Sequence, residues 1–212
     1  MVFHNVIEGL LADKVKIRTF RTLQNHPQGL TGRGIASLVG TSPFKISLVL
    51  RQLVSEGILD VSSVGKAHLY QINQNHIVVR DIIFKLLNYE KNLLDQLGTI
   101  VMESLSPKPL SVILYGSIAR GEETPASDID LCLVYADDDS IQGLSEMIGE
   151  SSDLDKIHRT FGNPVSTLRI KVSETREREK RKDPLWRKIV KEGQVIAGLS
   201  TLEILIHGGK KK

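Results

Sequence analysis

One segment of the sequence constrains the fold more than any other. The apolar, β-rich run Leu110–Tyr115 leads directly into Gly116 and Ser117. Ten residues after Ser117, a second run begins as Ser127–Leu131, alternates carboxylate and aliphatic side chains, and continues as aliphatic residues. Both runs have the composition and length of β-strands. The sequence therefore predicts two strands, the first ending in a glycine turn and the second beginning with an acidic pair.

The acidic pair, Asp128 and Asp130, indicates a site for a divalent cation. Residues two apart in a strand point to the same face of the sheet, so the two carboxylates project side by side. Two nearby carboxylates repel each other unless a cation lies between them. Hard oxygen ligands of this kind suit Mg²⁺ or Mn²⁺, which bind a few carboxylates together with substrate phosphates.

The residues after the first strand indicate phosphate binding. A glycine such as Gly116 lets backbone N–H groups approach a phosphate, and Ser117 adds a hydroxyl donor. Arg120 either neutralises a phosphate or pairs with a nearby carboxylate, and the residue pattern leaves both roles open. Together, these groups favour metal-assisted nucleotidyl transfer.

The whole pattern resembles the polymerase-beta-like nucleotidyltransferase superfamily, of the minimal and kanamycin nucleotidyltransferase type. The resemblance rests on Gly-Ser-Ile-Ala-Arg-Gly followed by Ser-Asp-Ile-Asp-Leu, and it extends from Leu110 to about Val172. It implies that Gly116 and Ser117 bind the nucleotide, with Arg120 beside them. It also implies that Asp128 and Asp130 are the catalytic residues and hold the metal, Mg²⁺ or Mn²⁺. The substrate would be a nucleoside triphosphate such as ATP.

The chain departs from the superfamily pattern at one position. Active members generally have a third carboxylate on a later strand, where it activates the acceptor hydroxyl. The expected strand here, Pro164–Val172, contains no Asp or Glu, and Ser166 or Thr167 would stand in its place. A hydroxyl is a poor base near neutral pH. The alternatives for this role are Glu174 just beyond the strand, and Asp153, Asp155 or His158 from the preceding helix.

The first third of the chain predicts a different module. Asp13 is placed to cap a helix that starts at Lys14, and a second helix is expected over Gly32–Val39. A third helix is expected over Ser42–Glu56, followed by two short β runs around a polar tip at residues 62–66. This order resembles the winged helix-turn-helix of bacterial and archaeal repressors, which implies binding to double-stranded DNA through the third helix and the wing. The candidate DNA contacts are Ser42, Lys45, Ser47, Arg51, Gln52 and Lys66.

Charge and composition agree with this division. Residues 1–80 hold 9 Lys and Arg against 4 Asp and Glu, whereas the rest of the chain holds 19 against 21. A basic N-terminal part is typical of a module that meets a polyanion. The single cysteine, Cys132, excludes a disulfide framework within the chain and favours a reducing cytoplasm. No apolar run is long enough for a membrane-spanning helix, so no membrane association is expected.

We therefore expect an α+β chain with an N-terminal winged helix-turn-helix and a C-terminal nucleotidyltransferase-fold mixed sheet flanked by helices. The expected domains are 1–76 and 107–212, joined by a helical connector over 77–106. The connector has an apolar stripe that would pack on the second domain or on a partner copy, so a homodimer is expected. The resemblance to minimal nucleotidyltransferases implies a small helical protein partner as another possibility. The predicted function is metal-dependent transfer of a nucleoside monophosphate to a hydroxyl acceptor, with DNA binding. The alternative is a nucleotide-sensing, DNA-binding transcriptional regulator whose transferase domain is catalytically degenerate.

Overall fold

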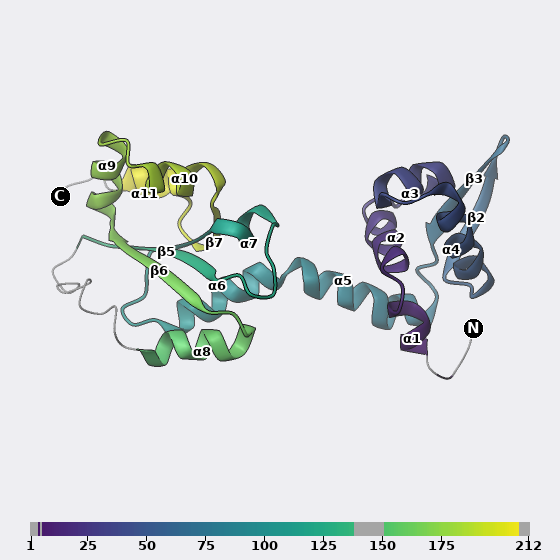
Figure 1. Ribbon diagram of the computed structural model, residues 1–212, viewed down its shortest axis with the longest axis horizontal. Coiled ribbons are helices and arrows are strands. Elements are labelled where there is room, and N and C mark those ends of the chain that lie inside the picture. Colours follow the sequence, from purple (N-terminus) through teal and green to yellow (C-terminus); the bar gives the residue numbers. More distant parts are fainter. Residues whose placement is uncertain (1–3, 5, 138–150, 208–212) are drawn as a thin grey trace. The chain divides into compact units, whose positions relative to one another are not determined.

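The chain folds into two compact units, residues 1–91 and residues 92–212. The computed structural model describes residues 4, 6–137 and 151–207. Each unit has a sheet of its own, as Figure 1 shows, and its own buried hydrophobic residues. Among the described residues, no helix could span a membrane.

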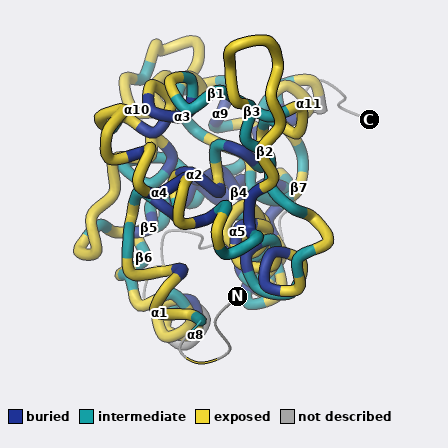
Figure 2. The backbone as a smooth tube through the Cα atoms, turned by 90° about the vertical axis from the view of Figure 1, so that its right-hand side faces the viewer, coloured by how far each residue is buried: buried dark blue, intermediate teal, exposed yellow. Residues whose placement is uncertain are grey.

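The first unit is a winged helix-turn-helix. Its helices are α1 (Val6–Leu11), α2 (Lys14–Gln24), α3 (Gly32–Val39) and α4 (Pro43–Ser55). A three-stranded antiparallel sheet in the order β1-β3-β2 forms the wing, from β1 (Leu30–Thr31), β2 (Leu59–Val64) and β3 (Ala67–Ile72). The exposed turn that joins β2 and β3 is the tip of the wing (Figure 2).

Side-chain caps begin three of these helices, among them the cap at Asp13 that is predicted from the sequence above. Asp13 Oδ1 accepts a hydrogen bond from the backbone N–H of Val15 at 2.8 Å, and α2 begins at the next residue after Asp13. Thr31 Oγ1 accepts from the N–H of Gly34 at 3.2 Å and begins α3. Ser42 Oγ accepts from the N–H of Lys45 at 3.2 Å and begins α4, with Pro43 at the first helical position. These side chains satisfy N–H groups that have no partner within a helix.

The helical stretch from residue 77 to residue 106 divides between the two units. The π-helical turn η1 (Val79–Ile83) and α5 (Phe84–Lys91) belong to the first unit, where Val79, Ile83 and Leu87 join its core. Helix α6 (Leu93–Ser104) belongs to the second unit, where Leu97 and Val101 are buried. The apolar stripe of the expected connector is therefore only partly covered within the chain, because Leu86, Tyr89 and Leu93 remain exposed.

The second unit is built on a mixed four-stranded sheet in the order β6-β5-β4-β7. The strands are β4 (Ser111–Tyr115), β5 (Ile129–Tyr135), β6 (Val165–Lys171) and β7 (Gln194–Gly198). Strand β4 is antiparallel to both β5 and β7, whereas β5 and β6 are parallel. The helices of this unit are α7 (Gly116–Arg120), α8 (Ser151–Phe161), α9 (Val172–Lys180), α10 (Pro184–Glu192) and α11 (Thr201–His207).

Helices cover both faces of this sheet. Helices α6 and α8 lie on one side, and α9, α10 and α11 lie on the other (Figure 1). Leu131 and Leu133 of β5 point into the first core, and Cys132 and Val134 point into the second core around Trp186. Because side chains alternate along a strand, Asp130 shares its face with Cys132. Helices α9, α10 and α11 cover that face.

Candidate nucleotide site and nucleic-acid surface

The Gly-Ser turn lies directly against one of the two predicted acids. Tyr115, the last residue of β4, pairs with Asp130 of β5 across the antiparallel ladder. Gly116 follows with φ +79°, a left-handed conformation that favours glycine. A Cβ at Gly116 would overlap the Asp130 carboxylate and lie 3.0 Å from its Cγ atom. The fold therefore brings Gly116 and Asp130 together, and the pairing of β4 with β5 is the cause.

The two carboxylates share one electrostatic environment. Burial raises the pKa of Asp130 above its usual range, and the charge of Asp128 raises it further. The cationic side chains of Lys188 and Arg120 act in the opposite direction. Asp128 itself is exposed just before β5 begins, and Asp130 is half-buried. A pair of neighbouring carboxylates, one of them partly desolvated, is a donor set that fits a hard divalent ion.

Arg120 is held by acidic side chains. Its Nε lies 2.7 Å from Glu122 Oε2, and its Nη1 lies 3.5 Å from Glu192 Oε2 at the end of α10. Gln194 Nε2 adds a hydrogen bond of 2.8 Å to the backbone oxygen of Ala119. These contacts fasten α7 to α10 and to the start of β7. Of the two roles left open for Arg120, the structure shows carboxylate pairing.

The candidate DNA contacts lie on α4 and at the tip of the wing. Ser47, Arg51 and Lys66 are exposed, and Arg51 Nε lies 3.4 Å from the backbone oxygen of Ser47. Lys45 Nζ lies 3.0 Å from Asp13 Oδ2, and Gln52 donates to Glu56 at 2.9 Å. Ser42 is exposed, although its hydroxyl already caps α4.

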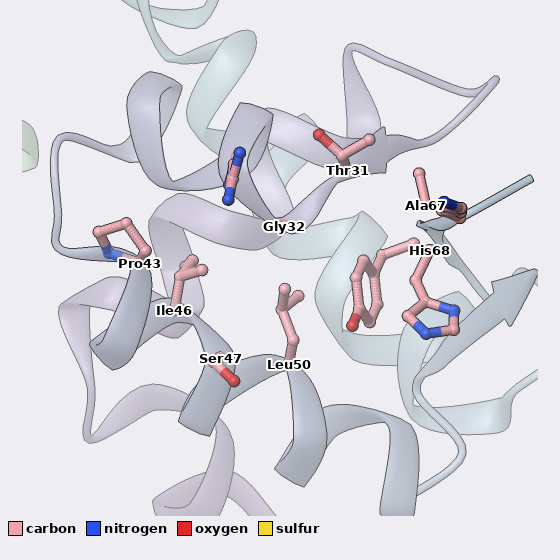
Figure 3. Close-up of a pocket in the computed structure, with 11 residues that line it drawn as sticks. Thr31, Gly32, Pro43, Ile46, Ser47, Leu50, Ala67 and His68 are labelled. Atoms are coloured by element: carbon pink, nitrogen blue, oxygen red, sulfur yellow. The ribbon is translucent and has the colours of Figure 1, made fainter. Parts of the chain in front are cut away.

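A cavity of about 610 Å³ lies between α3, α4 and the wing. Ile46, Ser47 and Leu50 of α4 line it from below in Figure 3, and Thr31, Gly32, Ala67 and His68 line it from above and from the side. Arg33 and Lys66 also line this cavity. A second cavity of about 410 Å³ lies between α4 and the hairpin, and Arg51 and Tyr70 are among its lining residues. Basic side chains thus border cavities on α4 and the wing.

Comparison with known proteins identifies the second unit. Residues 95–196 match the model of the nucleotidyltransferase domain family. The second unit contains a nucleotidyltransferase domain. A search of curated proteins found no match to this chain.

Several solved structures resemble parts of the chain at low sequence identity. A predicted DNA-binding transcriptional regulator from E. coli is 22% identical, with 39% of this chain and 83% of that chain covered and a TM-score of 0.34. The antimony-specific transcriptional repressor AntR is 24% identical, with 43% and 76% covered and a TM-score of 0.35. A toxin–antitoxin structure with AMP-PNP is 18% identical, with 53% and 78% covered and a TM-score of 0.36.

The strand register of the nucleotidyltransferase domain determines what stands beside the acidic pair. Strand β6 is parallel to β5, and Ser166 is the register partner of Asp130. Residues that pair across neighbouring strands point to the same face, so Ser166 and Asp130 share a face. The next residue, Thr167, pairs with Leu131 and belongs to the opposite face. The position beside Asp130 is therefore occupied by a hydroxyl group.

The alternative bases of the nucleotidyltransferase domain lie elsewhere. Glu174 lies beyond the C-terminal end of β6, whereas Ser166 lies near its start. The Glu174 carboxylate accepts a hydrogen bond from the N–H of Lys171 at 3.4 Å. Helix α8, which carries Asp155 and His158, packs through Leu154 and Ile157 on the sheet face opposite Asp130. The side chain of Asp153 is outside the described part of the chain. Among the described residues, no group of three or more His, Cys, Asp and Glu is arranged to hold a metal ion.

Two residues near the carboxylates were missed by sequence reasoning. Lys188 and Glu192 both lie on α10, one helical turn apart, and they act on Asp130 and Arg120 respectively. The sequence indicates an amphipathic helix here, with Trp186 and Ile189 buried. It contains no signal that the polar side of this helix meets α7, because that contact depends on how α10 packs across the sheet.

Replacing Gly116 with alanine is expected to disrupt the nucleotide site. The positive φ costs about 1–3 kcal/mol of the free energy of unfolding when a residue other than glycine adopts it. The new Cβ would also displace the Asp130 carboxylate. Urea unfolding and equilibrium binding of ATP with Mg²⁺ measure the two effects.

Gly121 provides a matched control for that variant. It has φ +68°, and a Cβ there would meet no atom within 4 Å. Gly121→Ala should therefore lose stability through its backbone conformation alone and keep nucleotide binding. If both variants bind ATP equally well, the overlap with Asp130 has no functional consequence.

Replacing Asp130 with asparagine is expected to stabilise the metal-free protein at neutral pH. The raised pKa of Asp130 means that its protonated form favours the folded state, and that this contribution is lost as the pH rises through the folded-state pKa. A neutral amide in place of the carboxylate avoids the loss, so the melting temperature should rise by roughly 1–3 °C. The advantage should shrink as the pH is lowered. Calorimetry across this pH range, with chelator present, measures it, and a lower melting temperature at neutral pH would contradict it.

Proposed function

We propose that this chain is a metal-dependent nucleotidyltransferase with a DNA-binding winged helix. It transfers a nucleoside monophosphate from a nucleoside triphosphate, such as ATP, to a hydroxyl acceptor. The observation that supports this most directly is the close approach of Gly116 to Asp130, beside Asp128. This arrangement places a turn that can bind phosphate next to a pair of carboxylates that can hold a cation.

The residues of the site have distinct roles in this proposal. Asp128 and Asp130 hold Mg²⁺ or Mn²⁺, which supplies charge neutralisation at the phosphates and activates the attacking oxygen when it is bound. Gly116 leaves room for the phosphate chain, and the Ser117 hydroxyl donates to it. Arg120 positions α7 through its ion pairs with Glu122 and Glu192.

The N-terminal unit supports DNA binding through its shape and charge. Helix α4 and the tip of the wing expose Ser47, Arg51 and Lys66 on a module with an excess of basic residues. Such a module is expected to bind duplex DNA with an affinity that falls steeply as the salt concentration rises.

Ser166 favours a second candidate function. Ser166 stands beside Asp130, and its hydroxyl is a poor group for deprotonating an acceptor near neutral pH. A domain of this kind can bind a nucleotide and thereby change the DNA affinity of the first unit, with little or no transfer of the nucleotidyl group. This alternative is a nucleotide-sensing transcriptional regulator.

One experiment separates these functions. The full chain is incubated with Mg²⁺ and ATP labelled on the α-phosphate, with cell extract as the source of acceptors, and transferred label is measured beside ATP binding. Label transferred by the wild type and lost in Asp128→Asn supports the transferase. Mg²⁺-dependent ATP binding that changes DNA affinity without transfer supports the sensor. Absence of ATP binding would exclude both.

A further inference from the structure

The outermost line of helix α4 carries two apolar side chains that no core covers. Phe44, Leu48, Arg51 and Ser55 recur at intervals of four, three and four residues, and all four are exposed. The buried residues of α4 lie on the opposite side of the helix and are Ile46, Val49, Leu50 and Leu53. Phe44 is 73% exposed, the largest value among the big hydrophobic side chains that the structure describes, and Leu48 is 44% exposed. The side of α4 that faces away from the core is therefore partly apolar.

The charge around this line indicates the occupant. From Ser42 to Ser55 the chain contains Lys45 and Arg51 and no acidic residue. Arg33 and Lys66 line the cavity on α4, and Arg51 lines the cavity between α4 and the hairpin. An apolar line bordered by cations complements a polyanion that presents apolar groups between its phosphates. Duplex DNA fits this description, because its major groove admits an α-helix and displays the methyl group of thymine.

We propose that Phe44 and Leu48 recognise thymine methyl groups in the major groove, so that α4 selects A·T base pairs. This inference rests on the DNA binding proposed above. Phe44 lies in the first turn of α4, where recognition helices contact base edges. Leu48 lies one turn further along the same line, and Arg51 follows it. Apolar contact between a side chain and the methyl group distinguishes thymine from the other bases.

The test removes the methyl groups without altering base pairing. Fluorescence anisotropy with the full chain compares a short alternating dA·dT duplex with the same duplex in which uracil replaces thymine. The wild type should bind the uracil duplex more weakly, by roughly four-fold for each methyl group lost from an apolar contact. A dG·dC duplex should gain affinity when 5-methylcytosine replaces cytosine, because its methyl group occupies the same place in the groove.

Variants of Phe44 connect the effect to this side chain. Phe44→Ala should lose most of the preference for methylated bases and keep the salt dependence of binding, because it removes no charge. Phe44→Leu, which retains an apolar group, should keep part of the preference. Tyr89→Ala is a matched control, since it removes an aromatic side chain that is 58% exposed on α5 and should leave the preference intact.

The outcomes separate this inference from the proposed function. If no duplex is bound in a salt-sensitive way, the proposed DNA binding itself fails. If duplexes are bound and the thymine and uracil forms are equal, only the methyl recognition is overturned. Sedimentation analysis tests whether a second copy of the chain contacts this line. A change of oligomeric mass in Phe44→Ala would show such a contact and would also overturn the inference.

Discussion

Asp130→Asn is expected to reduce Mg²⁺-dependent ATP binding and nucleotide transfer by at least about a hundred-fold. Asparagine keeps the size of the side chain and removes its charge, so the site loses half of its carboxylate pair. Asp130 lies against Gly116 and interacts electrostatically with Asp128. The substitution therefore affects both the Gly-Ser turn and the acidic pair. Initial rates with α-labelled ATP and the dissociation constant of ATP in the presence of Mg²⁺ measure the effect.

Asp155→Asn is the matched control for this variant. It makes the same change of net charge on α8, which packs on the opposite face of the sheet. It should leave ATP binding and transfer near the wild-type level. The metal-free Asp130→Asn protein is expected to be at least as stable as the wild type, so unfolding cannot account for its loss. Equal ATP binding by Asp130→Asn and the wild type would refute the assignment of this carboxylate.

Ser166→Asp is expected to increase the rate of nucleotide transfer by about a hundred-fold, near the lower end of the contribution of a general base. Ser166 is exposed, is the register partner of Asp130 and lies on the same face of the sheet. An aspartate there would provide the third carboxylate that β6 lacks. The same change should lower the melting temperature of the metal-free protein, because a third negative charge joins the pair.

Two further variants isolate the role of the new carboxylate. Ser166→Asn has a similar size and no charge, so its transfer rate should stay at the wild-type level. The double variant Ser166→Asp with Asp130→Asn should be inactive, because the new base has no function without the acidic pair. If Ser166→Asp binds ATP but has the wild-type transfer rate, a carboxylate at position 166 does not act as the general base. The sensor function would then be favoured.

Local interactions account for what the sequence predicts well. The predicted cap at Asp13 acts within its own helix, and α3 has the expected bounds. The strands on either side of Gly116 and Asp128 lie within one or two residues of their expected positions. The sequence does not predict strand β1, because Leu30–Thr31 is too short to show the alternation of a strand. This strand is defined by its pairing with β3.

The surface of α4 carries exposed apolar residues beside the polar residues that the sequence indicates as DNA contacts. The winged-helix resemblance makes Ser42, Lys45, Ser47, Arg51 and Gln52 candidate contacts, and they stay predictions. In the structure, Lys45 pairs with Asp13 and Gln52 pairs with Glu56. Phe44 and Leu48 share the outermost line of the helix with Arg51. In the sequence, their spacing of four residues, on the side of the helix opposite the buried stripe, indicates that they are exposed.

The sequence by itself determined the residues of the candidate nucleotide site: a glycine turn after one strand, an acidic pair at the start of the next, and no acid on the strand that follows. These features are local, because they depend on residues close together in the chain and on the alternation of side chains along a strand. Only the tertiary structure decided that Gly116 touches Asp130, that Ser166 stands beside it and that α10 contributes Lys188 and Glu192. These neighbours are set by strand register and by helix packing across the sheet, where burial of side chains from distant segments selects one arrangement.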